Sequence, residues 1–476
     1  MNRRNLAAHV ALALTFVMVA AVAGHLSRLG TGKKEAVTGV LVGVGEGGAA
    51  PRAVSAEEAG EPEVLVRFRA GVPRERVEEI AMSFGDRVED EIESVENLYA
   101  VDDLEGETAA LVAGEYGALP EVEYVEENAR IDLSPLEGRE LGRGIEDAEA
   151  GGPNDPLLGE QWGLINRGQR SGKDKADISA LQAWAKTHGS ERVVVAVLDS
   201  GVDYTHPDLV NNLWLRPDDL DPYYDDETGE VEDYRGFSAV SPERDPMDEN
   251  GHGTHCSGIA GAEGDNGIGI TGVNWKVEIM PLKFMGKGGY GSTKDAIEAI
   301  NYVIKRKRDG VNVRVISASW GSRQKSRALE EVIRRAGDEG ILFVAAAGNN
   351  SENADRFPHY PSGYQLPNVL AVAALDRRDE LARFSNYGAK SVHVAAPGAE
   401  ILSTWLGDSY REASGTSMAT PMVAGVAALV LSCEPNLSVA ELKERLMSTS
   451  DSIATLQGKV VSGGRVNAAR AVGAVR

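Results

Sequence analysis

The heptad Gly415-Thr416-Ser417-Met418-Ala419-Thr420-Pro421 opens a run of small and apolar residues that continues to Leu431. A run of this length without a charged residue predicts a buried helix. A serine in its first turn lies beside backbone N–H groups that the helix cannot satisfy, and near the positive end of the helix dipole. The heptad therefore indicates a place where an anionic intermediate can be stabilised next to Ser417.

Two other segments supply the side chains that a reactive serine needs. Asp199 follows the strand-like run 193–198, and His252 lies in Asn250-Gly-His-Gly-Thr-His-Cys-Ser-Gly258. A serine hydroxyl is a weak nucleophile until a base takes its proton, and an imidazole does this near pH 7. A carboxylate on the other ring nitrogen orients the imidazole and stabilises its charged form. Singly, Asp199 could be a turn residue and His252 a polar residue at a helix start, but together with Ser417 they predict a catalytic triad.

These motifs, in the order Asp, His, Ser, resemble those of the subtilisin-like serine peptidases, the subtilase family, from about residue 154 to residue 471. The resemblance implies a secreted serine endopeptidase of broad specificity, which hydrolyses peptide bonds through an acyl-enzyme and is made as a self-processing zymogen. It also implies that Asn349, which closes the strand-like run 341–348, donates a hydrogen bond to the oxyanion. An asparagine there could instead only cap a turn.

The resemblance further implies which residues hold an extended peptide substrate. Two segments would be edges between which the peptide adds as a strand, and a third would line the pocket for the residue before the scissile bond. These residues are Gly289, Tyr290, Gly291, Ser319, Trp320 and Gly321 for the edges, and Ala346, Ala347 and Gly348 for the pocket. We expect a roomy, uncharged pocket with an apolar preference. A basic preference is the alternative, if Glu352 and Asp355 make its mouth acidic.

Oxygen-rich segments predict structural calcium, a cation that takes about six to eight oxygen ligands in proteins. By resemblance, the ligands are three side chains and three backbone carbonyls. They are Asp155, Asp208 and Asn266, with the carbonyls of Gly264, Ile268 and Ile270. Asp208 could instead be only a helix cap. The acidic runs 225–233 and 245–248 could hold a second ion or be solvated charges.

Residues 154–476 are expected to form a doubly wound α/β domain, with a mostly parallel sheet and helices on both faces. Continuously apolar strands separated by amphipathic helices are typical of such a sheet. The expected strands are 193–198, 277–284, 313–318, 341–346, 369–374 and 392–395. Ligands bind at the carboxyl ends of such strands, and Asp199, Ser319 and Asn349 each follow a strand end.

The residues before this domain fall into four parts. Residues 1–23, with a basic start and an apolar core, predict a cleaved signal peptide, and the alternative is an uncleaved membrane anchor. Residues 24–60 predict a disordered connector rich in Gly, Ala and Glu. Residues 61–134 predict a small α+β domain, and the polar residues 135–153 predict an accessible linker that can be cut.

In residues 61–134 the periodicity predicts strand, helix, strand, strand, helix and strand, with the first helix over 74–84. By resemblance this domain is an inhibitory propeptide that precedes the catalytic domain. A permanent accessory domain is the alternative. The linker that follows it favours the propeptide.

Charge and cysteine content limit the partners. The chain has a net charge of −24, and residues 61–134 carry 21 acidic but only 6 basic side chains. Nucleic-acid binding needs clustered Lys and Arg, so we expect protein or peptide substrates and the chain's own propeptide as partners, with a membrane only if the leader stays uncleaved. Cys256 and Cys433 are expected to be free, buried thiols too far apart for a disulfide. Cys256 as a nucleophile is the alternative to a small core residue.

A non-catalytic binding module on a peptidase scaffold is the alternative of a different functional class. Degenerate scaffolds commonly lack at least one catalytic group. The presence of Asp199, His252, Ser417 and Asn349 together therefore favours the enzyme.

Overall fold

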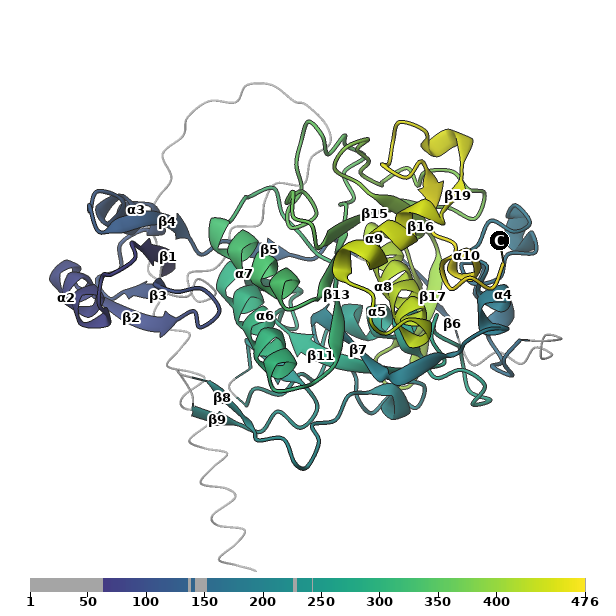
Figure 1. Ribbon diagram of the computed structural model, residues 1–476, viewed down its shortest axis with the longest axis horizontal. Coiled ribbons are helices and arrows are strands. Elements are labelled where there is room, and N and C mark those ends of the chain that lie inside the picture. The colour runs from purple at the N-terminus through teal and green to yellow at the C-terminus, as the bar shows by residue number, and fades with distance from the viewer. Residues whose placement is uncertain (1–62, 136–137, 142–151, 226–228, 242, 476) are drawn as a thin grey trace, which may run out of the picture. The chain divides into compact units, whose positions relative to one another are not determined.

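The computed structural model describes residues 63–135, 138–141, 152–225, 229–241 and 243–475 (Figure 1). The predicted signal peptide and connector lie outside these residues, as does most of the predicted linker. The described residues form a small α+β domain followed by a larger α/β domain.

The small domain is a four-stranded antiparallel sheet with two helices, in the strand order β2-β3-β1-β4. Its elements are β1 (Glu63–Phe68), α2 (Arg74–Phe84), β2 (Asp86–Glu91), β3 (Leu98–Asp103), α3 (Ala109–Gly117) and β4 (Val122–Glu127). Helix α2 begins after Pro73 and ends at Gly85, whose left-handed conformation suits glycine. Phe68 on β1 packs in one core with Ile80 and Tyr116 of the helices. The predicted order of elements is confirmed.

The larger domain is built on a nine-stranded sheet in the order β10-β11-β7-β13-β14-β15-β16-β20-β19. Its strands are β7 (Gly189–Asp199), β10 (Phe237–Ser238), β11 (Lys276–Lys283), β13 (Val313–Ala318), β14 (Leu342–Ala346), β15 (Val369–Leu375), β16 (Val394–Pro397), β19 (Asp451–Ser452) and β20 (Gly464–Arg465). Neighbouring strands run parallel except for the pair β19 and β20. The predicted fold class, a mostly parallel sheet preceded by a small α+β domain, is confirmed.

Helices cover both faces of this sheet (Figure 1). One face carries α4 (Ala180–Trp184), α5 (His252–Gly261), α8 (Thr416–Cys433), α9 (Val439–Ser448) and α10 (Ala468–Ala471). The other carries α6 (Thr293–Arg308) and α7 (Arg327–Asp338). Strand β7 therefore buries both of its sides: residues 193, 195 and 197 pack toward α8, and residues 194, 196 and 198 pack toward α6. This double burial explains why the strand reads as a continuous apolar run.

Shorter elements connect these layers. They are β5 (Arg130–Asp132), β6 (Glu140–Leu141), β8 (Tyr223–Asp225), β9 (Gly229–Val231), β12 (Tyr290–Ser292), β17 (Ile401–Trp405), β18 (Ser409–Ala413) and four 3₁₀ turns at Leu158–Glu160, Gln169–Ser171, Val210–Asn212 and Ala454–Leu456. The β17–β18 hairpin was not predicted because hydroxyls interrupt its apolar pattern. The hydroxyls of Ser403 and Thr404 are buried and donate to the backbone carbonyls of His255 and Thr254 on α5.

The register of the parallel strands brings their carboxyl ends to one edge. Leu198 of β7 pairs with Ala318 of β13, which in turn pairs with Ala345 of β14. The residues that follow these strands, Ser319 and Asn349 among them, therefore lie at the same edge of the sheet as Asp199. Among the described residues, α8 alone is long and apolar enough to cross a membrane, and it is buried inside this domain.

Candidate active site

Asp199 and His252 meet between the end of β7 and the start of α5. The Nδ1 atom of His252 lies 2.7 Å from Oδ1 of Asp199, and both side chains are buried, with exposed fractions of 1% and 0%. Burial is the largest single effect and lowers the pKa of His252. The charge and hydrogen bond of Asp199, together with the neighbouring Cys256, outweigh it, so the pKa is raised well above 6.5. The Nε2 atom of His252 has no hydrogen-bond partner among the described residues. This pair can therefore accept a proton at Nε2 and stabilise the resulting imidazolium.

Asp248, which no motif indicated for this role, holds together the segments that carry Asp199 and His252. Its carboxylate accepts hydrogen bonds from the backbone N–H groups of residues 250, 251 and 254, at 2.9–3.0 Å. It also accepts from the hydroxyl of Ser200, the residue after Asp199, and this hydroxyl accepts from the N–H of Gly253. The carboxylate thus fixes the helix start that carries His252 against the strand end that carries Asp199. Because these donors satisfy the buried carboxylate, Asp248 gives no support to a second ion site in the run 245–248.

Ser417 lies in the first turn of α8, where Pro421 changes the usual hydrogen bonding. Proline has no N–H, so Ser417 O lacks the partner that residue 421 would supply in a regular helix. The hydroxyl of Ser319 donates to Ser417 O instead, at 2.8 Å, and the Ser417 hydroxyl donates to Ser319 O at 2.9 Å. The two serines thereby tie the start of α8 to the end of β13.

Asn349 is oriented by the residue before the serine. Its side-chain oxygen accepts from the backbone N–H and the hydroxyl of Thr416, at 2.8 and 2.9 Å. These contacts commit the oxygen and leave the amide nitrogen as the group that can donate to a ligand. Asn349 and Ser417 line one cavity, so this donor faces the same space as the serine.

Cys256 lies beneath these groups on α5. Its sulfur is 3.8 Å from Nδ1 of His252 and 3.6 Å from Ser417 O, and the side chain is fully buried. Burial raises the pKa of the thiol, which keeps it protonated near neutral pH and argues against a nucleophile. Both cysteines are free as predicted, but Cys433 is only half-buried because it ends α8 near the surface.

The predicted substrate edge carries a segment of the chain itself. Strand β5 pairs antiparallel with β12, with Asp132 opposite Tyr290 and Ile131 opposite Gly291. The pairing continues as the N–H of Leu133 donates to Gly289 O at 2.8 Å. Ser134 then lines both the cavity that contains Ser417 and the cleft that contains His252. An extended peptide thus fits along this edge and reaches the cavities that contain Ser417 and His252.

The predicted pocket residues are only partly brought together. The cavity beside Ser417 is lined by Ser319, Trp320, Gly321, Ala346 and Gly348. Ala347 is fully buried and packs instead with a separate core cluster around Ala373. Asp132 and Ser134 of the chain's own extended segment also line this cavity, and the space left beside them measures about 20 Å³. The expectation of a roomy pocket in the free enzyme therefore stays a prediction.

His359, which no sequence motif indicated, also lines this cavity. Glu352 and Asp355, which could have made its mouth acidic, are not among the described residues that line it. Glu352 pairs with Arg323 at 2.6 Å, and Asp355 accepts hydrogen bonds from Ser391.

The small domain also contacts the starts of two helices of the larger domain. The carboxylate of Glu126 accepts from the hydroxyl of Ser326 and from the N–H groups of residues 327 and 328 at the start of α7. The side chain of Asn128 accepts from the N–H of Lys294 at the start of α6, at 2.8 Å. Both contacts satisfy N–H groups that a helix leaves without a partner. The small domain therefore contacts the larger one through polar side chains that cap α6 and α7.

The predicted calcium residues form a buried carboxylate site. Asp208 accepts from the N–H of Ile270 at 2.9 Å and from the amide of Asn266 at 2.8 Å, while Asp155 accepts from the N–H of Asp265 at 2.8 Å. Oδ1 of Asp155 is buried without a hydrogen-bond partner among the described residues. Burial, followed by the charge of Asp208, raises the pKa of Asp155 to about 7. The loop that carries Gly264 and Ile268 joins these groups, so the site suits a hard cation.

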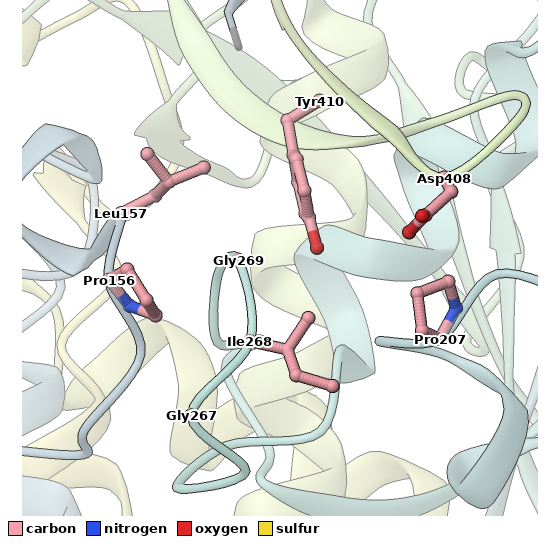
Figure 2. Close-up of a pocket in the computed structure, with 8 residues that line it drawn as sticks. All are labelled: Pro156, Leu157, Pro207, Gly267, Ile268, Gly269, Asp408 and Tyr410. Atoms are coloured by element: carbon pink, nitrogen blue, oxygen red, sulfur yellow. The ribbon is translucent and has the colours of Figure 1, made fainter. Parts of the chain in front are cut away.

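A cavity of about 350 Å³ adjoins this site (Figure 2). Proline, leucine, isoleucine and glycine make up most of its lining, and the hydroxyl of Tyr410 points toward the loop that carries Ile268. This hydroxyl donates to Asp208 at 3.0 Å. The hairpin that carries Tyr410 is thus tied to the proposed calcium residues.

Comparison with known proteins gives a consistent result. Residues 190–473 match the model of the Subtilase family. The chain is 39% identical over 290 residues to thermophilic serine proteinase of Bacillus sp. (strain AK1), covering 61% of this chain and 64% of that protein. It is 35% identical over 320 residues to thermitase of Thermoactinomyces vulgaris, covering 67% and 99%.

Two further relatives are longer than the region they share with this chain. The halolysin-like extracellular serine protease Nep of Natrialba magadii is 33% identical over 356 residues, which cover 74% of this chain and 56% of that protein. Subtilisin-like protease 2 of Plasmodium falciparum (isolate 3D7) is 36% identical over 304 residues. The match spans only 22% of that protein's length.

We predict that replacing Asp199 with Asn lowers the pKa of His252. The variant loses the carboxylate charge that raises this pKa, while the burial that disfavours the imidazolium remains. Titration of the chain's eight histidines by ¹⁵N NMR measures this shift. His255 is an internal control, because burial lowers its pKa to about 3 and it should stay neutral in both proteins. An unchanged pKa of His252 in the variant would contradict the pairing described above.

Proposed function

Because the chain belongs to the subtilase family of serine peptidases, we propose that it is a secreted endopeptidase in which Asp199, His252 and Ser417 form the catalytic triad. The observation that carries the proposal is the 2.7 Å contact between buried Asp199 and His252, with Ser134 of the chain's own extended segment reaching both His252 and Ser417. Secretion is supported by the sequence of residues 1–23 and by a relative that is itself named extracellular.

The chemistry follows from what each group can do. The Ser417 hydroxyl turns from Ser319 O toward Nε2 of His252, which takes its proton as the oxygen attacks the scissile carbonyl carbon. Collapse of the tetrahedral intermediate breaks the C–N bond, and the proton passes from His252 to the leaving amine. Water then attacks the acyl-enzyme in the same way and releases a carboxylic acid. Asp199 keeps Nδ1 protonated and stabilises the imidazolium throughout.

Two donors are proposed to stabilise the oxyanion of this intermediate. One is the amide nitrogen of Asn349, whose other end is held by Thr416. The second is the backbone N–H of Ser417, which lies in the first turn of α8 and has no partner within the helix. Donors fixed in advance at the developing negative charge act mainly in the transition state.

We further propose that residues 61–134 are an inhibitory propeptide and that the linker 135–153 is cut by the enzyme itself. Three contacts support this: the pairing of β5 with β12, and the caps that Glu126 and Asn128 place on α7 and α6. The first contact occupies the edge where a substrate would add as a strand. A non-catalytic binding module has no comparable support, because Asp199, His252, Ser417 and Asn349 are all present.

We propose one structural calcium ion held by Asp155, Asp208 and Asn266 with the carbonyls of Gly264, Ile268 and Ile270. The partnerless buried oxygen of Asp155 and the nearby carboxylate of Asp208 support this assignment. Bound calcium would neutralise both charges and join the start of the catalytic domain to the loop 264–270. The acidic run 225–233 gains no support as a second site, because Asp233 pairs with Arg306 and Arg216.

We predict that replacing Ser417 with Ala abolishes both reaction with a fluorophosphonate probe and removal of the propeptide. The variant should accumulate as a precursor that keeps residues 61–134, since the nucleophile for self-cleavage is missing. Mass spectrometry of the product from a protease-deficient host measures this. Ser432→Ala, near the other end of α8, should be processed and labelled normally. Normal trimming of Ser417→Ala would show that another enzyme does the processing.

We predict that replacing Asn349 with Ala lowers kcat while KM stays nearly unchanged. The expected loss is about 10²–10³-fold, the effect measured when the oxyanion donor of a subtilisin is removed. Steady-state kinetics on an amide substrate tests this, with Asn350→Ala as the neighbouring control. An unchanged kcat, with chemistry rate-limiting, would remove Asn349 from the oxyanion site.

We predict that chelation lowers the melting temperature of the mature enzyme before it lowers initial activity. A ligand bound only by the folded state adds about 4 kcal/mol of stability at a thousandfold excess over its Kd, and none of the triad residues is a proposed ligand. Calorimetry with and without EDTA measures the effect. Asp208→Ala should melt lower and no longer respond to EDTA, whereas the exposed Asp218→Ala should behave as the wild type. If EDTA leaves the melting temperature of the wild type unchanged, the calcium assignment is wrong, and any loss of stability in Asp208→Ala comes from its hydrogen bonds alone.

A further inference from the structure

A histidine lines the cavity beside Ser417. With Asp132 and Ser134 of the chain's own segment in the cleft, a space of about 20 Å³ remains, and His359 lines it together with Ser319, Gly321, Ala346 and Gly348. Ser319 and Gly321 follow β13, whereas Ala346 ends β14 and Gly348 follows it, so these two segments form two walls of the pocket. His359 comes from a third segment, between β14 and β15, so it is placed to set the depth of the pocket between these walls.

The imidazole of His359 packs directly against both walls. A Cβ atom added at Gly321 would overlap the ring, and one added at Gly348 would lie 3.0 Å from its Cδ2. These glycines therefore provide the room that the ring occupies. Because the ring touches both walls, it spans the space between them.

Hydrogen bonds hold the ring in this position. The imidazole bonds to the backbone carbonyl of Ala346, in the wall itself, and the hydroxyl of Ser362 donates to His359 O at 2.8 Å. Burial lowers the pKa of His359 to about 4, and the positive charge of Arg323 acts in the same direction. The ring is therefore neutral near pH 7 and offers no charge to a substrate.

Among the described residues of the extended segment that follows β4, Asp132 and Ser134 line the cavity. Ser134 carries a small side chain, and it also lines the neighbouring cleft together with His252. The segment itself thus presents a small residue to a small space.

We propose that His359 determines substrate specificity by blocking the pocket next to Ser417, so that the enzyme prefers a small, uncharged residue such as Ala or Ser before the scissile bond. This inference rests on the proposed function and replaces the broad apolar preference expected from the sequence. A basic preference lacks support, because no acidic side chain of the larger domain lines the cavity in the described residues. Leu, Phe and Lys side chains would have to displace the ring.

The test compares peptide amides that differ only in the residue before the scissile bond: Ser, Ala, Leu, Phe or Lys. For the wild-type enzyme, kcat/KM for Ala and Ser should exceed that for Leu and Phe by at least about tenfold, since one misplaced methylene in a pocket changes selectivity about 10–200-fold. His359→Ala removes the ring beyond Cβ. It should raise kcat/KM for Leu and Phe by at least about tenfold and change that for Ala by less than about threefold.

Two control variants separate the effect of the ring's volume on specificity from a general effect of replacing a histidine. His359→Phe keeps a ring between the walls without its hydrogen bond and should retain the preference for small residues. His188→Ala removes an exposed histidine that stacks on Trp275 elsewhere in the domain, and it should not change the profile. A wild-type preference for Leu or Phe would overturn the proposal, and so would an unchanged profile in His359→Ala.

Labelling of each variant by the fluorophosphonate probe shows whether a negative result concerns the role of His359 alone or the proposed function as well. Full labelling with an unchanged profile overturns the role of His359 alone. A wild-type enzyme that does not react with the probe and cleaves none of the peptides overturns the proposed function and this specificity with it. A melting temperature for each variant shows whether any lost activity comes from unfolding.

Discussion

Helix α8 is buried from Thr416 to Leu431, and this burial fixes where its first turn lies. An uncharged helix of this length gains its stability by removing apolar surface from water, so it packs along the sheet beneath β7, β13, β14, β15 and β16. Its start then falls at the carboxyl ends of these strands. The polar groups gathered there depend on that placement: Ser319 bonds to Ser417, and Asn349 bonds to Thr416. The position of the serine is thus a consequence of core packing.

Much of this arrangement could be read from the sequence, because its main causes are local or periodic. Continuous apolar strands predicted a sheet covered on both faces, and the small domain has the predicted order of elements. Asp199, Ser319 and Asn349 were placed at one edge for a general reason, since parallel strands share their carboxyl ends. His252 lies 53 residues from Asp199 along the chain, and motif context alone indicated that the two meet.

The features that could not be predicted depend on contacts between distant segments. Asp248 looked like part of an acidic run, and only the folded chain shows its carboxylate surrounded by N–H donors. His359 carries no periodic signal, and its ring reaches the pocket because Gly321 and Gly348 leave space for it. The β17–β18 hairpin was missed because its buried hydroxyls satisfy carbonyls of α5. Burial of a polar side chain with a partner far along the chain leaves no mark in a hydropathy pattern.

Backbone contacts and side-chain contacts play different parts in peptide recognition in this cleft. The pairing of β5 with β12 uses backbone groups, which every residue except proline can offer, so it holds an extended segment of almost any sequence. Selection must therefore come from the pockets that receive side chains. The larger domain lines one next to Ser417, and we propose that the neutral imidazole of His359, bonded to the Ala346 carbonyl, limits its size. A pocket restricted by a ring rather than by a charge discriminates by volume, because a side chain that is too large must displace packed atoms instead of losing a single attraction.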